Sequence, residues 1–103
     1  MEKFEALYQG MYDDLKDSEM MIKYARKIMK NPKDKGLADE IAKYAQWRLE
    51  HFKIFHKLFQ AEAEKEAAEN EFDKQKVNDC LWNQTHKHLM EWHAHIKEKI
   101  DSY

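Results

Sequence analysis

Apolar side chains recur along this chain at spacings of three and four residues, which is the period of an amphipathic α-helix. The pattern predicts three helices, over about residues 2 to 30, 37 to 69 and 73 to 101. The apolar stripes are, in order, Phe4, Leu7, Tyr8, Met11, Leu15, Ile22, Ala25 and Met29; Leu37, Ile41, Ala45, Leu49, Phe52, Phe55, Phe59 and Ala63; and Leu81, Trp82, Leu89, Trp92, Ile96 and Ile100. Each predicted helix therefore has one face to bury.

Breaks between these helices are sparse, because the chain holds only two glycines and one proline. Pro32 denies its predecessor helical geometry and lacks an amide donor, so the first helix is expected to end near Lys30. The second boundary is expected between Asn70 and Asp73, either of which can cap a helix. The sequence thus predicts an all-α fold, an elongated antiparallel three-helix bundle in which residues 1–103 form a single helical domain.

A second apolar seam lies beside the main stripe of the middle predicted helix and consists of Trp47, Ile54 and Leu58. The first predicted helix carries similar off-stripe side chains at Met20, Tyr24 and Ile28. Helices of about 30 residues make a slender rod, about 45 Å long, whose thin core would leave this surface partly exposed in a monomer. We expect a second copy of the chain or a partner protein to cover this apolar surface.

The composition excludes several classes of protein. With 43% hydrophobic and 37% charged residues the chain is too apolar for disorder, and its uncharged apolar runs are too short for a transmembrane span or a signal peptide. Cys80 is the only cysteine, so no internal disulfide can form, and a reducing, cytoplasmic location is expected. A net charge of −2 gives no general attraction to nucleic acid, and direct binding to it is not expected.

Charge is segregated along the chain. The turn near residue 33 is rich in lysine, whereas the end of the middle predicted helix carries the glutamates Glu62, Glu64, Glu66 and Glu69. Antiparallel packing would place these regions at opposite ends of the rod. A charge run is often only a solvated face. As a binding surface, the four glutamates would engage a basic partner such as a nucleic-acid-handling protein, and they are the predicted partner-binding residues.

Counting outward from each turn places Glu19, Arg48 and Trp92 at one level of the predicted bundle. Arg48 lies within the apolar stripe of the middle helix, where an unpaired guanidinium would be costly to bury. We therefore predict an ion pair between Glu19 and Arg48, stacked against Trp92. The polar side of the first predicted helix, where solvated carboxylates are expected, carries Asp13, Asp14 and Asp17.

Six histidines are present, and four of them lie between residues 86 and 95. His88, Glu91 and His95 share one flank of the third predicted helix, and layer counting places His51 level with His88 and Glu91. A histidine and a carboxylate three or four residues apart on a helix can share a zinc ion, so these four residues are the predicted metal site. The alternative is that the histidines are structural, since the chain has neither a His-Glu-x-x-His nor a Cys-x-x-Cys motif.

The first predicted hairpin resembles the first two helices of the rubrerythrin and ferritin-like proteins. The resemblance covers residues 15–60 and is carried by Glu19, Tyr24-Ala25, Asn31-Pro32, Ala42, Ala45 and Arg48-Leu49-Glu50-His51-Phe52. In that family a glutamate of the first helix and a Glu-x-x-His of the second bind a di-iron centre, so the resemblance implies Glu19 and His51 as ligands. Arg48 stands at the glutamate position of the motif, and a cation there repels iron, so the implied site is degenerate.

Enzymatic activity is not expected, because the chain has no glycine-rich phosphate loop, no Gly-x-Ser-x-Gly and no nucleophile motif around Cys80. In size and composition the chain resembles small phage-encoded inhibitors, including anti-CRISPR proteins, without sharing a motif with them. The sequence favours a non-enzymatic protein-binding module that inhibits a larger, nucleic-acid-handling protein and is stabilised by zinc. The alternative is a ferritin-like metal-binding oligomer with a degenerate di-iron site.

Overall fold

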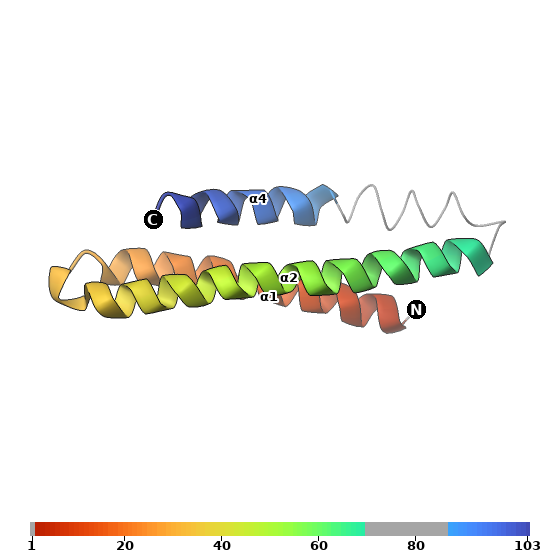
Figure 1. Ribbon diagram of the computed structural model, residues 1–103, viewed down its shortest axis with the longest axis horizontal. Helices are drawn as coiled ribbons and strands as arrows, with labels where there is room; N and C mark the ends of the chain where they lie inside the picture. Colours follow the sequence, from red (N-terminus) through yellow and green to blue (C-terminus); the bar gives the residue numbers. More distant parts are fainter. Residues whose placement is uncertain (1, 70–86) are drawn as a thin grey trace.

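The computed structural model describes residues 2–69 and 87–103, which are helical throughout apart from short turns (Figure 1). The elements are α1 (Glu2–Ile28), a short 3-10 helix η1 (Pro32–Asp34), α2 (Lys35–Glu69) and α4 (Lys87–Asp101). The predicted all-α class is confirmed, and the first two predicted helices are correct to within two residues at each end. Residues 73–86 of the third predicted helix lie outside the described residues, and α4 is its remainder.

The turn between α1 and α2 follows from Asn31 and Pro32. Asn31 is extended, with φ −98° and ψ 113°, and its side-chain oxygen accepts a hydrogen bond from the Lys33 backbone amide. Pro32 occupies the first position of η1, where its missing amide donor is not needed. The chain therefore reverses direction within a few residues, and α2 runs antiparallel to α1 (Figure 1).

The core changes in character along the α1–α2 hairpin. Near the turn it consists of small side chains around one isoleucine: Ile22, Ala25, Ala42 and Ala45. Farther from the turn it contains larger side chains from all three helices: Met11, Leu15, Leu49, Phe52, Phe59, Ala63, Leu89 and Ile96. Ser18 fits between the helices because its buried hydroxyl donates to the Ala45 carbonyl at 2.7 Å.

The α4 helix lies along the hairpin and contacts both of its helices (Figure 1). The Trp92 indole NH donates to the Glu19 carboxylate, and the Tyr103 hydroxyl donates to Asp39 Oδ1 at 2.9 Å. Arg26 Nη2 donates to the Lys99 carbonyl at 2.9 Å. These contacts orient α4 parallel to α1. None of the described helices is long and apolar enough to cross a membrane.

Candidate functional site

A buried polar cluster lies between α1 and α2. The Asp14 side chain is only 1% exposed, and Arg48 Nη2 lies 3.0 Å from its Oδ1. His51 Nδ1 lies 2.8 Å from Asp14 Oδ2, so one carboxylate oxygen forms an ion pair with Arg48 and the other forms a hydrogen bond with His51. Arg48 Nη2 also lies 2.7 Å from Asp17 Oδ2 at the outer edge of the cluster. The paired donors offset the cost of burying the Asp14 charge.

Two predictions about these residues are wrong. Arg48 pairs with Asp14 and Asp17 rather than with Glu19, and Asp14 is buried rather than solvated. The predicted position of Glu19 along the bundle axis was nearly right, but Glu19 lies on a different side of α1 from the one that faces Arg48. At 100° per residue it points about 140° away from Asp14 around α1, and it faces Trp92 on α4 instead.

The sequence does contain a signal for the burial of Asp14. Asp14 lies three residues after Met11 and four before Ser18, and both of these are buried. The same spacing that marks the apolar stripe therefore includes an aspartate. An acidic residue within such a stripe indicates a paired carboxylate whose donors come from the facing helix.

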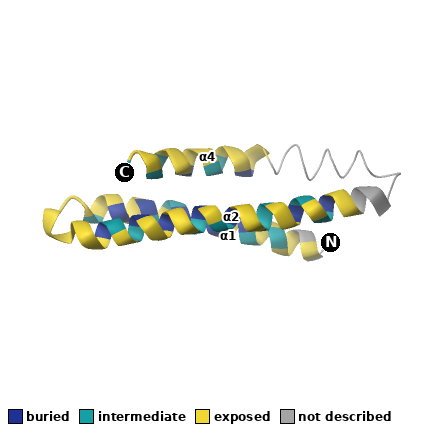
Figure 2. Cartoon of the chain, in the orientation of Figure 1, coloured by how far each residue is buried: buried dark blue, intermediate teal, exposed yellow. Residues whose placement is uncertain are grey.

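The outward side of α2 carries large apolar side chains that remain about half exposed. They are Tyr44 (54%), Trp47 (51%), Ile54 (56%) and Leu58 (49%), and we call these four residues the exposed seam. His51 lies among them, 31% exposed, and its ring contacts those of Trp47 and Phe55. The prediction that Trp47, Ile54 and Leu58 form a second, exposed seam is confirmed, and Tyr44 extends it by one turn. Figure 2 shows the alternation of buried and exposed positions along α2.

The four residues predicted to bind zinc do not lie together in the described part of the structure. His88, Glu91 and His95 are exposed on α4, whereas His51 Nδ1 is engaged by Asp14. Within residues 2–69 and 87–103, no group of three or more histidine, cysteine or carboxylate side chains could hold a metal ion.

The predicted acidic binding residues lie near the end of α2. Glu62 is half-buried and forms a 2.9 Å ion pair with Lys3, and the hydrogen bond from Lys3 lowers the pKa of Glu62. Glu64 is exposed. Glu66 and Glu69 belong to α2, but their side chains lie outside the described part of the structure.

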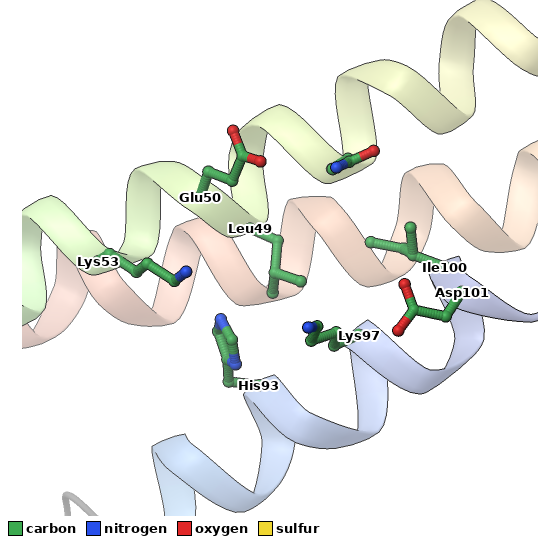
Figure 3. A pocket seen from close by; sticks show the side chains of 8 residues that line it. Leu49, Glu50, Lys53, His93, Lys97, Ile100 and Asp101 are labelled. Carbon is green, nitrogen blue, oxygen red and sulfur yellow. The ribbon is translucent and has the colours of Figure 1, made fainter.

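A small groove of about 160 Å³ lies between α2 and α4 (Figure 3). It is lined by Gln46, Leu49, Glu50, Lys53, His93, Lys97, Ile100 and Asp101. His93 extends from α4 towards α2, and burial, followed by Lys53, Lys97 and His56, lowers the pKa of its imidazole below the ordinary 6.5. The lysines and the carboxylates of the lining balance each other, so the groove has no strong preference for an anion or a cation.

A second groove, of about 220 Å³, is strongly basic and lies at the hairpin end of the molecule. Its lining comprises Ile22, Lys23, Arg26, Lys27, Lys30 and Lys99. Together with Lys33 and Lys35 in the turn, these side chains make the hairpin end of the molecule positive.

No family model, no curated protein and no solved structure matches this chain. The features of the described structure that bear on function are the exposed seam and the buried Asp14–Arg48–His51 cluster.

Proposed function

We propose that this chain is a non-enzymatic protein-binding module, and that it binds an amphipathic helix of its partner along the exposed seam of α2. One observation carries the proposal. A single helix of 35 residues has an inner face that is buried and an outer face on which four large apolar side chains stay about half exposed. Water-exposed apolar surface of this kind is typical of an interaction site.

The chemistry of the seam suits a binding interface. Trp47 and Tyr44 are aromatic and contact each other, with ring centroids 5.4 Å apart. Tryptophan and tyrosine dominate the energetic centres of protein interfaces because they bury a large area with few rotatable bonds. His51 connects the seam to the buried cluster, because its ring contacts Trp47 and its Nδ1 is held by Asp14; this orders that part of α2 and reduces the entropy lost on binding.

The proposal also includes an inhibitor role against a larger nucleic-acid-handling protein and an elongated three-helix bundle over the whole chain. The acidic contact to this partner is proposed to involve Glu62, Glu64, Glu66 and Glu69. A stabilising zinc ion is also part of the proposal, and elemental analysis of the purified protein tests it directly, with about one zinc per chain expected. A ferritin-like oligomer has no specific observation in its favour among the described residues, since Arg48 fills the ligand position and is itself paired.

Site-specific photo-cross-linking in the native cell tests the binding function. A photoreactive amino acid replaces Trp47 in one variant and Lys16, an exposed residue of α1, in a matched control. We expect an adduct from position 47 alone, mapping to the apolar face of a helix, which disappears when Ile54→Lys is added. Equal adducts at both positions, or none at either, would refute the proposal.

A further inference from the structure

The exposed seam, taken together with His51, has the spacing of a coiled-coil interface. Tyr44, Trp47, His51, Ile54 and Leu58 follow one another at alternating steps of three and four residues, which are the a and d positions of successive heptads. The same register extends towards the acidic end through Ala61, which is exposed. The surface is therefore shaped for a second long helix lying along α2.

We propose that this second helix is the α2 helix of another copy of the chain, packed antiparallel across the exposed seam. The proposal rests on the proposed function, because it names the helix that the seam binds. An antiparallel pair with its twofold axis between His51 and Ile54 places Tyr44 opposite Ala61 of the second copy, and Trp47 opposite Leu58. Each large aromatic side chain thus meets a smaller aliphatic one, as close packing requires.

The charged residues beside the seam agree with this register. Lys43, Glu50, Lys57 and Glu64 are exposed and occupy the g positions that flank the seam. In the proposed pair Lys43 lies opposite Glu64 of the second copy, and Glu50 lies opposite Lys57 of the second copy. Every one of these flanking pairs joins opposite charges. A parallel pair would instead place Lys43 beside Arg48, which repels it.

The ends of α2 supply a second argument from charge. The helix has no acidic residue in its first turn and no basic residue in its last, and it begins with Lys35 and ends with Glu69. The helix dipole favours the opposite arrangement, with acidic residues first and basic residues last. An antiparallel second α2 brings the glutamate-rich end of one copy next to the lysine-rich turn of the other, so opposite charges from the second copy offset the unfavourable charge at each helix end.

The exposed seam supplies about half of the area that a dimer needs. The four residues of the exposed seam keep about half of their surface exposed, and side chains of this size present about 200 Å² each, which leaves roughly 400 Å² of apolar surface. The flanking lysine and glutamate stems add to this area over more than three helical turns. A standard specific interface buries roughly 800 Å² per partner, so the flanking stems and the two ends of the helix pair supply the other half.

Sedimentation equilibrium of the full chain tests the proposal. We expect twice the 12.5 kDa mass of one chain at concentrations near 100 µM, with dissociation on dilution. Ile54→Lys should weaken the dimer at least about tenfold. Met20→Lys, at an exposed apolar residue of α1 outside the seam, is the matched control and should leave the dimer intact. A monomer at every concentration, or a dimer that Ile54→Lys does not weaken, would overturn the proposal.

Charge reversal tests the orientation. Glu50→Lys and Lys57→Glu should each weaken the dimer several-fold, because each creates two like-charge pairs across the interface. The double variant should restore it, since the introduced lysine of one copy then faces the introduced glutamate of the other. A parallel dimer does not bring these positions together, so a double variant that is as weak as either single one would overturn the antiparallel register. All variants lie at exposed positions, and circular dichroism verifies that each remains helical.

The failure of this inference and that of the proposed function give different results. A purified chain that is monomeric, while the cross-linker at position 47 captures a helix of another protein, refutes the dimer and supports the binding function. A monomeric chain with no adduct at position 47 refutes both.

Discussion

Replacing Asp14 by asparagine is the most informative perturbation of the fold. The variant keeps the size of the side chain but removes its charge and one of its two acceptor oxygens. The ion pair with Arg48 at 3.0 Å is then lost, and the one remaining side-chain oxygen can accept the 2.8 Å hydrogen bond from His51 only if it turns away from Arg48. Asp13, the next residue, is exposed and accepts a hydrogen bond from the Gln9 amide within the same helix, so Asp13→Asn is a matched control.

The magnitude follows from burial. Removing one partner of a fully buried ion pair costs about 3–5 kcal/mol. The side chain of Arg48 is 22% exposed and retains Asp17 at 2.7 Å, which reduces the loss to about 2 kcal/mol. For a domain of this size that corresponds to a fall in Tm of roughly 10–15 °C. Asp13→Asn should change the free energy of unfolding by less than about 0.5 kcal/mol.

Thermal and urea denaturation, followed by circular dichroism, measure both variants. A double variant, Asp14→Leu with Arg48→Leu, adds a stricter condition. Its loss should be smaller than the sum of the single losses by at least about 1 kcal/mol, because removing both charges leaves neither a buried carboxylate nor a buried guanidinium unpaired, and Asp17, which also loses Arg48, is half exposed to water. Equal losses for Asp13→Asn and Asp14→Asn, or strictly additive losses in the double variant, would refute the ion-pair explanation.

Three further outcomes are expected. The pKa of His93 is lowered below 6.5 in the folded state, so its contribution to stability is present above pH 6.5 and is lost as the pH falls from there towards the folded pKa. His93→Gln should therefore flatten the dependence of Tm on pH between 7.5 and 5.5, and an unchanged slope would contradict this. Gly36→Ala has nothing within 4 Å of the added Cβ and should stabilise the protein by about 0.5 kcal/mol in urea denaturation. At Gly10 the added Cβ would lie 2.8 Å from the Phe55 ring, so Gly10→Ala should be neutral or destabilising in the same assay. Trp92→Phe removes a hydrogen bond between α4 and α1 and should lower the free energy of unfolding by about 1–2 kcal/mol, while an unchanged value would mean that the bond contributes nothing.

Most of the exposed seam was predictable from the sequence. Trp47, Ile54 and Leu58 were expected to form a second apolar face, since they lie off the main stripe at helical spacing, and they are exposed as predicted. Tyr44 has the same spacing one turn earlier and was missed. The partners of Arg48 were not predictable by counting residues from the turns, because counting estimates the level along the bundle and not the direction around each helix.

The sequence by itself determined which of the described residues form helices and where the first hairpin turns. Helical periodicity and the single proline are local properties, and each acts over a few residues. Only the tertiary structure decided which polar groups meet, because a rotation of one helix by a fraction of a turn exchanges Asp14 for Glu19 at the contact with Arg48. The cost of burying an unpaired charge selects between such rotations, and that cost depends on all three helices at once.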